Sequence, residues 1–408
     1  MSQAKVSTYA EFSLAVHHGA KSRIPLNATV EVTHRCNLDC VHCCNNLSAG
    51  DREARSHELT VDKHRRLLDE MAEAGCFWLL FTGGEPFLRP DFLEIYDLAK
   101  ERGFLITLFT NGTTVTPEIA DHLAERPPFR IEISVYGRTQ EVYEAVTRTP
   151  GSYRKCMRGI ELLRERKLPL ALKTMALSVN RSEIPALKQF ADSLGLPFRF
   201  DAIVNARVDC SHSPLAVRLK PEEVVEMDLA DEARAAALRE LAERGRPRSI
   251  EDGLYRCGGG ITAFAVDPCG GMRLCSLINK ASADLNTVSL AEAWNEHLGQ
   301  LRKTPSTRLT KCIGCTLSHL CGMCPANGEL ENGDPEKPVE FLCATAHLRA
   351  FALEVPVNPH YSCEYCPGGA KHEQMLEKAS RIVGRTVVAK MGVPSNGNDA
   401  KGRLVTLE

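Results

Sequence analysis

The chain lacks the features that mark secreted, membrane-spanning or nucleic-acid-binding proteins. None of its apolar runs is long enough to cross a bilayer, and its first residues contain neither the apolar stretch nor the cleavage site of a signal peptide. Over 408 residues the formal net charge is only -2, so no broad basic surface is available to nucleic acid or to an anionic membrane. We therefore expect a cytoplasmic protein without a nucleic-acid or membrane partner.

Cysteine is what the chain has in abundance. There are 17, an odd number, and a disulfide scaffold does not suit a reducing compartment. Clustered cysteines in such a compartment more often bind metal. They form an N-terminal group (36–44), a dense group (257–343) and a late pair (363–366), with three scattered cysteines between the first two groups.

Short apolar runs alternate with amphipathic stretches from residue 26 to 204. The runs are NATVEVT, FWLLFT, FLITLFT, FRIEISV, LALKTMAL and FRFDAIV, and the helical patterns between them cover residues 61–74, 91–102, 117–125 and 153–167. Strand–helix alternation at this spacing predicts parallel strands joined by right-handed crossovers. Six such units predict an α/β fold with a partial (β/α)6 TIM-like barrel, whose chemistry sits at the carboxyl ends of the strands.

The composition changes along the chain in a way that predicts five segments. They are an N-terminal segment (1–25), the partial barrel (26–215), a helical bridge (216–250), a cysteine-rich α+β domain (251–350) and a partly disordered C-terminal tail (351–408). The fourth segment is rich in glycine and its apolar core is thin, so bound metal would have to supply stability.

The first cysteine group follows the first predicted strand in the sequence EVTHRCNLDCVHCC. Cys36, Cys40 and Cys43 have the spacing C-x3-C-x2-C. Three thiolates on one loop can hold three irons of a cubane and leave the fourth iron open to a substrate. The alternative is a zinc ion with Cys44 or His42 as its fourth ligand, although two adjacent cysteines on one ion would be strained.

This motif, with His42 in the aromatic position before the third cysteine, resembles the radical S-adenosylmethionine superfamily. Further matches to the family fall at successive strand ends, and they are Gly83, Gly84, Glu85, Pro86, Asn111, Ser134, Lys173, Asp201 and Ala202. The resemblance implies that the glycine-rich turn binds the methionine amino group, where only glycine lets a backbone come so close. It implies a ribose contact at Ser134, a carboxylate contact at Lys173 and adenine contacts near Asp201.

The cofactors follow from the same resemblance. It implies a 4Fe–4S cluster whose open iron binds S-adenosylmethionine, and reductive cleavage of that molecule to a 5′-deoxyadenosyl radical. The radical would abstract hydrogen from a substrate held against it, so positioning is the protein's main contribution.

The second cysteine group resembles the SPASM extension of peptide-modifying maturases, which carries two auxiliary 4Fe–4S clusters. The resemblance implies an outer cluster on Cys312, Cys315, Cys321 and Cys343, and an inner cluster on Cys257, Cys275 and Cys324. The inner cluster would take Cys269 as its fourth ligand or keep an open iron. One loop is shorter than in the family, with two residues between Cys321 and Cys324. Two structural zinc ions are the alternative to these clusters.

Two further cysteine features stay open. Cys363 and Cys366 lie beyond the family pattern and are a spare ligand pair, half of a zinc site or two exposed thiols. Cys210 follows the sixth strand and is a weak catalytic candidate, as a hydrogen donor to a substrate radical.

The leading interpretation is a SPASM-type radical enzyme, oxidoreductase-like, that modifies a ribosomally made peptide. The product would be a thioether, carbon–carbon or ether cross-link, or another side-chain or backbone change. Only 35 residues precede Cys36, so we expect a separate leader-peptide-binding protein, together with a reductant such as flavodoxin or ferredoxin. The alternatives are a sulfatase-type maturase, an enzyme acting on a small molecule such as a tetrapyrrole, and a non-enzymatic iron–sulfur electron-transfer protein. The GGEP turn argues against the last, because a relay needs no amino-acid site.

Overall fold

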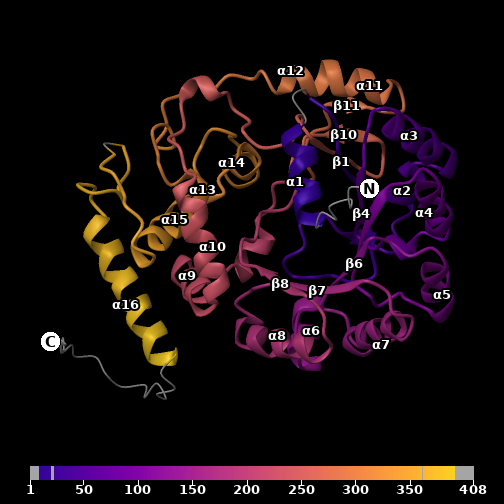
Figure 1. Ribbon diagram of the computed structural model, residues 1–408, viewed down its shortest axis with the longest axis horizontal. Helices are drawn as coiled ribbons and strands as arrows, with labels where there is room; N and C mark the ends of the chain where they lie inside the picture. Colours follow the sequence, from indigo (N-terminus) through magenta and orange to yellow (C-terminus); the bar gives the residue numbers. More distant parts are fainter. Residues whose placement is uncertain (1–8, 20–22, 361, 391–408) are drawn as a thin grey trace, which may run out of the picture. The chain divides into compact units, whose positions relative to one another are not determined.

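The computed structural model describes residues 9–19, 23–360 and 362–390 (Figure 1). These residues belong to two compact units, which we treat separately. Unit 1 comprises Met1–Arg218, Glu251–Ser306 and Cys324–Glu336, and unit 2 comprises Leu219–Ile250, Thr307–Met323 and Lys337–Glu408. Within the described ranges no helix is long and apolar enough to span a membrane. The predicted disorder at the end of the tail, after residue 390, falls outside the described residues.

Unit 1 is built on one mixed sheet, and its six predicted parallel strands are confirmed. They are β1 (Asn27–Thr33), β4 (Trp78–Gly83), β5 (Leu105–Thr110), β6 (Arg130–Ser134), β7 (Leu170–Met175) and β8 (Phe198–Asp201). They lie in chain order and every neighbouring pair is parallel. The two outer strands of the sheet, β8 and β11, do not pair with each other within the described residues. The α/β prediction with an open arrangement is therefore confirmed.

The crossover helices surround the strands in Figure 1. They are α3 (Val61–Glu73), α4 (Phe92–Glu101), α5 (Pro117–Glu125), α6 (Gln140–Thr147), α7 (Ser152–Glu165) and α8 (Ile184–Ser193). Threonine hydroxyls at positions 60, 116 and 139 accept backbone N–H bonds and cap three of these helices. The apolar side chains of these helices bury against the sheet.

Short elements surround the strand ends of unit 1. They are α1 (Tyr9–Gly19), β2 (Arg35–Cys36), β3 (Leu47–Ser48), α2 (Arg52–His57) and the 3-10 turns η1 (Pro86–Leu88), η2 (Arg181–Glu183) and η3 (Ser213–Val217). The strand pair β2–β3 is parallel and contains Cys36, so the cysteine loop begins on regular backbone.

Three short strands from the cysteine-rich segment extend the sheet beyond β1, and the sequence did not predict them there. They are β9 (Ala263–Val266), β10 (Gly271–Arg273) and β11 (Ala283–Asp284). β9 pairs in parallel with β1 from Asn27↔Ala263 to Val30↔Val266, and β10 and β11 follow antiparallel. The helices that follow in unit 1 are α11 (Leu290–Glu292), the π-helix η5 (Ala293–Leu298), α12 (Gly299–Leu301) and α14 (Pro325–Asn332).

Unit 2 is helical in its described residues. Its helices are α9 (Pro221–Ala230), α10 (Glu232–Glu243), α13 (Ser318–Cys321), α15 (Glu340–Ala352) and α16 (His372–Lys390), and the turn η4 (Ile250–Asp252) begins at its boundary with unit 1. Within the predicted helical bridge (216–250) the helices are α9 and α10. The helix α16 was not predicted, because its sequence reads as a polar tail. Its apolar residues Met375, Ala379 and Ile382 bury against α9 and α15.

A buried carboxylate joins α9 to α15 in unit 2. Asp228 is 1% exposed, and Oδ2 accepts a bond of 2.7 Å from Nε of Arg349. Its other oxygen accepts from Nε of Arg234, and Arg349 also donates to the carbonyl of Leu320. Each charge in this group depends on its partners, since an isolated buried charge is costly.

We expect Asp228→Ala to destabilise unit 2 by about 3–5 kcal/mol, because it leaves the Arg349 guanidinium buried without a carboxylate. Hydrogen–deuterium exchange of α9 and α15 measures the loss of protection. Glu240→Ala is the matched control, since the pair of Glu240 with Arg244 is exposed and contributes less than about 1 kcal/mol. Equal protection in the two variants would contradict this account.

Candidate functional site

The cysteines of the loop after β1 are half-buried, and this burial changes the chemistry of their thiols. Burial raises the pKa of Cys36 to about 12, and it also raises the pKa of Cys40 and of Cys43. A thiolate in this loop therefore needs a cation beside it, which a metal centre provides. The backbone N–H of Cys43 donates to the carbonyl of Cys40 at 3.1 Å and closes a tight turn.

The spacing of the three sulfurs bears on what they hold. Among the described residues, a single group of three or more potential ligands has all its ligand atoms within 4.8 Å of one another, and that group lies in unit 2. Cys36, Cys40 and Cys43 are therefore spread more widely than that. A cubane, which gives each thiolate its own iron, accommodates this spread better than a single zinc ion does.

The glycine turn after β4 lies directly against the cysteine loop. The N–H of Gly84 donates to the carbonyl of Thr33 at 2.7 Å, and the N–H of Glu85 donates to the carbonyl of Arg35 at 2.9 Å. A Cβ on Gly83 would lie 2.1 Å from the Thr33 oxygen, and one on Gly84 would lie 2.2 Å from the Arg35 oxygen. The glycines are thus required by the approach of two backbones, a reason that the sequence did not reveal.

Glu85 connects this turn to the loop after β5. Its fully buried carboxylate accepts bonds of 2.8 Å from the Thr110 hydroxyl and from the backbone N–H of Asn111. The Asn111 amide donates to Asn37 at 3.0 Å and lies 3.7 Å from the sulfur of Cys36. The GGEP and TNG motifs are therefore brought together around the cysteine loop. Pro86 begins the buried turn η1 behind them.

His42 and Ser134 meet at the end of β6 through Tyr136, which the sequence did not single out. The His42 ring lies edge-on to the Tyr136 ring at 4.8 Å between centroids, and the Tyr136 hydroxyl is hydrogen-bonded to Ser134. Burial lowers the pKa of His42 to about 4, so the imidazole is neutral at physiological pH. Its Nδ1 atom is buried without a hydrogen-bond partner, which leaves it available to a bound molecule.

Lys173 lies on β7 in register with Ser134 on β6. Its Nζ atom is 2.7 Å from the centroid of the Phe109 ring and 3.7 Å from the Glu132 carboxylate, and burial lowers the Lys173 pKa. Asp201 ends β8 and accepts a bond from a backbone N–H two residues on, and Ala202 is buried. The cofactor contacts predicted for these residues stay predictions.

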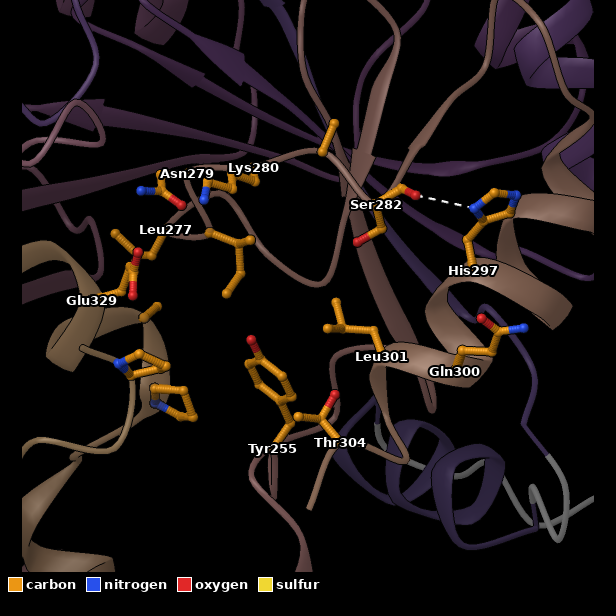
Figure 2. A pocket seen from close by; sticks show the side chains of 15 residues that line it. Tyr255, Leu277, Asn279, Lys280, Ser282, His297, Gln300, Leu301, Thr304 and Glu329 are labelled. Atoms are coloured by element: carbon orange, nitrogen blue, oxygen red, sulfur yellow. Dashed lines mark hydrogen bonds between the residues drawn. The ribbon is translucent and has the colours of Figure 1, made fainter. Parts of the chain in front are cut away.

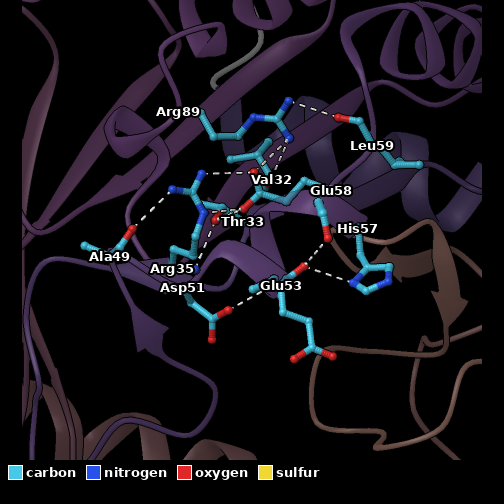
Figure 3. Close-up of polar contacts among 12 residues, drawn as sticks. Val32, Thr33, Arg35, Ala49, Asp51, Glu53, His57, Glu58, Leu59 and Arg89 are labelled. Carbon is cyan, nitrogen blue, oxygen red and sulfur yellow. Dashed lines mark hydrogen bonds and ion pairs between the residues drawn. The ribbon is translucent and has the colours of Figure 1, made fainter.

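A buried ion network supports the start of the cysteine loop (Figure 3). Arg35 donates to both oxygens of Glu58, at 2.8 and 3.0 Å, and Arg89 lies 3.9 Å from the same carboxylate. Arg89 also donates to the carbonyls of Val32 and Leu59, each at 2.9 Å. The side chains of Arg35, Glu58 and Arg89 are each less than 10% exposed. No local sequence pattern predicts this network.

The end of the cysteine loop is held by residues that follow β8. Arg207 donates to the carbonyl of Cys43 at 3.1 Å and to the side chain of Asn46 at 2.9 Å, while the N–H of Val208 donates to the carbonyl of Cys44. The weak candidate Cys210 follows in the same loop, with φ of +66° and a contact of 3.4 Å to the Asn279 amide. Sequence reasoning missed Arg207, which has no motif of its own.

The predicted inner set lies in unit 1 beside a cavity of about 580 Å³ (Figure 2). The Tyr255 hydroxyl faces the cavity and lies close enough to Cys257, Cys275 and Cys324 to interact with them electrostatically. Burial raises the Tyr255 pKa. The charged and polar residues lining the cavity include Asn279, Lys280, His297, Gln300 and Glu329.

Cys269 lies in a different place from these three cysteines. It is exposed in the turn between β9 and β10, where its N–H donates to Asp267, and it lines a separate cavity with His57 and Glu58. Its role as the fourth inner ligand stays a prediction.

The predicted outer set lies in unit 2. Cys312, Cys315 and Cys321 belong to the segment that includes α13, and Cys343 is on α15. The late pair is in the same unit, and Cys363 and Cys366 are only 5% and 4% exposed. The interpretation of this pair as exposed thiols is therefore wrong.

Comparison with known sequences agrees with these motifs. Residues 30–191 match the family model of the radical SAM superfamily. The AdoMet-dependent heme synthase of Methanosarcina barkeri is 27% identical over 335 residues, which cover 77% of this chain and 95% of that protein. The mycofactocin maturase MftC of Mycobacterium ulcerans is 31% identical over 262 residues, which cover 62% of this chain and 68% of the maturase. A PqqA peptide cyclase of Bradyrhizobium diazoefficiens is 32% identical over 171 residues, which cover 42% of this chain and 44% of the cyclase.

Comparison with solved structures supports the fold. Streptococcus suis SuiB superposes with a TM-score of 0.61 and 16% identity, covering 84% of both chains. The structure of anSMEcpe with bound AdoMet gives a TM-score of 0.59 and 15% identity, covering 88% of this chain and all of that one.

Replacing Gly84 by alanine should separate the glycine turn from the cysteine loop, because the added Cβ meets the carbonyl of Arg35 at 2.2 Å. We expect a loss on the order of 10²-fold in the cleavage of S-adenosylmethionine, as for an active-site displacement of about 1 Å. Gly50→Ala is the control, since nothing lies within 4 Å of its Cβ position. A wild-type rate in Gly84→Ala would show that the contact is dispensable.

Glu58→Ala should lower the free energy of unfolding of unit 1 by about 3–5 kcal/mol, because Arg35 would stay buried without a counter-ion. Urea unfolding followed by tryptophan fluorescence measures this, since both tryptophans, Trp78 and Trp294, lie in unit 1. Glu53→Ala, an exposed change on the neighbouring helix, should stay within about 0.5 kcal/mol of the wild type. Similar losses in both variants would argue against the network.

Proposed function

The chain belongs to the radical SAM superfamily, and from that we propose that it is a peptide-modifying enzyme whose centre is the loop of Cys36, Cys40 and Cys43. The observation that carries the proposal is the contact of this loop with the glycine turn at Gly83 and Gly84. A cluster loop alone would serve electron transfer, whereas a second strand-end motif packed against it serves the binding of an amino acid.

The residues around the loop fit a 4Fe–4S cluster and S-adenosylmethionine, the cofactors of this family. The buried thiols need a cation, and backbone N–H groups after Cys43 already point at its sulfur. We assign His42, whose Nδ1 is unpaired, to the cofactor, and Ser134 to the ribose, as the family resemblance implies. Together the two cofactors supply a 5′-deoxyadenosyl radical for hydrogen abstraction.

The chain's own residues position this chemistry. Glu85 and Asn111 fix the relative places of three strand-end loops, and Arg207 fixes the far end of the cysteine loop. Lys173 and Asp201 are assigned to the carboxylate and to the adenine by the family pattern.

We assign the remaining cysteines to two auxiliary clusters, which makes three in all. Each predicted set lies within one unit: the inner set in unit 1 and the outer set in unit 2. An electron acceptor beside the substrate suits a cross-linking reaction, because the carbon radical must lose an electron as the new bond closes. The cavity at Tyr255, whose lining includes Leu277 and Pro325 close after Cys275 and Cys324, is the place where we expect the substrate.

A ribosomally made peptide is the substrate class that the relatives favour. The PqqA peptide cyclase acts on a peptide by its name, and SuiB, which has a similar fold, is known with its precursor peptide SuiA. A separate leader-binding protein and a flavodoxin or ferredoxin reductant complete the system that we propose. All 17 cysteines are free of disulfides, which suits the reducing cytoplasm.

A tetrapyrrole is the second candidate substrate, favoured by one observation. The heme synthase of Methanosarcina barkeri aligns over 95% of its length, a larger share than either peptide-modifying relative above. The basic residues that line the cavity at Tyr255 are Lys280 and His297. Two basic side chains are few for binding a ligand with several propionate groups.

The anaerobic, reconstituted and dithionite-reduced protein should convert S-adenosylmethionine to 5′-deoxyadenosine, measured by liquid chromatography. Replacing Cys36, Cys40 or Cys43 by alanine should abolish the product, because each supplies one iron ligand. Cys44→Ala should retain it, and loss of the cluster in that variant alone would refute our assignment of the loop. No product from iron-loaded wild type would instead favour an electron relay.

The substrate is tested by adding probes to the same reaction. The probes are synthetic peptides encoded by short reading frames beside this gene and, separately, a propionate-bearing tetrapyrrole. Mass spectrometry should show a peptide that has lost a hydrogen pair, as cross-linking requires. Conversion of the tetrapyrrole, with the peptides unchanged, would overturn the peptide assignment.

A further inference from the structure

Four potential metal ligands lie close together in unit 2, and one of them, Cys343, also belongs to the predicted outer set. The Cys343 sulfur lies 3.8 Å from Nδ1 of His347. Cys343 and His347 lie on α15, and Cys363 and Cys366 lie in the loop that precedes α16. The ligand atoms of Cys343, His347 and Cys363 all lie within 4.8 Å of one another. The Nε2 atom of His347 is 3.5 Å from the sulfur of Cys363 and 3.3 Å from the sulfur of Cys366.

The local structure presents these atoms toward one another. Cys343 and His347 are four residues apart on a helix, so their side chains leave the same face. His347 is 1% exposed, and its Nδ1 donates to the carbonyl of Cys343 at 2.8 Å. This bond fixes the tautomer and leaves the Nε2 lone pair directed at the two thiols, the arrangement that ordinarily orients a metal-binding histidine.

The loop of Cys363 and Cys366 is a tight C-x2-C turn. The backbone N–H of Tyr365 is hydrogen-bonded to the Cys363 sulfur, and the N–H of Gly369 donates to the carbonyl of Cys366 at 2.8 Å. A Cβ on Gly369 would lie 2.5 Å from the carbonyl oxygen of Cys363, so the turn closes only around glycine. A C-x2-C turn facing a Cys and a His on a helix is the donor pattern of structural zinc sites.

The two contacts at His347 Nε2 favour a single ion, whereas the Cys366 sulfur lies outside the group of ligand atoms that are all within 4.8 Å of one another. Zinc bonds of about 2.3 Å to sulfur and about 2.0 Å to nitrogen separate tetrahedral ligands by about 3.5–4 Å. The contacts of 3.3 and 3.5 Å at His347 Nε2 are close to that value. A cubane would place its thiolates on different irons and so further apart.

We propose that Cys343, His347, Cys363 and Cys366 bind a structural zinc ion that joins α15 to the loop before α16. The site goes beyond the proposed reaction and does not depend on it, but it competes with the proposed outer cluster for Cys343. The family pattern assigns Cys343 to the outer cluster, whereas here it binds zinc. The outer set then consists of the three thiolates of Cys312, Cys315 and Cys321. The apolar core of unit 2 contains both cysteines of the loop, so the ion would also hold that core together.

The test is metal analysis of the whole protein, purified anaerobically. We expect about one zinc per chain in the wild type, less than a tenth of that in Cys363→Ser/Cys366→Ser, and a several-fold loss in His347→Gln. His319→Gln, a substitution of another histidine of unit 2, should keep its zinc. Zinc-edge X-ray absorption of the wild type should show three sulfurs and one nitrogen, a readout that needs no variant to fold.

Three results would overturn the proposal. The first is a wild type that contains iron but no zinc, and the second is a double variant that keeps its zinc. The third is a double variant that loses iron while its zinc content is unchanged, which would make Cys363 and Cys366 cluster ligands. Formation of 5′-deoxyadenosine tests a different unit. Zinc without that product would refute the proposed function alone, and the product without zinc would refute this inference alone.

Discussion

The contact between two backbones is the constraint on which the centre depends. The loops after β1 and β4 touch with no side chain between them, because the N–H of Gly84 bonds to Thr33 and the N–H of Glu85 bonds to Arg35. The register of two parallel strands therefore sets the distance between the cysteine loop and the glycine turn. Glu85 then carries the same alignment to Asn111 on the next strand. Hydrogen bonds thus join three loops from three strands, and their order follows from the sheet.

Local sequence patterns were enough to predict the barrel strands and the motifs at their ends. Apolar runs of strand length alternate with helical patterns, and the chemistry-bearing residues follow the runs directly. The supports of the motifs could not be predicted, because they are pairings between distant segments. Arg35 finds its counter-ion in Glu58, and Arg207 reaches back to the carbonyl of Cys43. The glycine turn shows a further limit of sequence-based prediction. The sequence predicted that glycine is needed at Gly83 and Gly84, but the cause, a neighbouring backbone, is visible only in the structure.

The cysteine-rich half was harder to predict for a related reason. The four residues of β9 are too few to show a period, and their partner strand lies near the start of the chain. The exposure of Cys363 and Cys366 depends on α15 and α16, of which α16 has a polar sequence with few apolar positions. His347 carried no signal, because a lone histidine on a helix is ordinarily a core residue. Only the fold places it against the two thiols.

The pairing of β9 with β1 has a consequence for how the protein is made. Proteins are synthesised from the N-terminus, so β1 and its cysteine loop leave the ribosome long before Ala263–Val266 does. Until then β1 presents an unpaired edge, which is the kind of surface that recruits other strands. The nascent chain must therefore hold the strand that carries its cluster loop as an open edge through more than half of its translation.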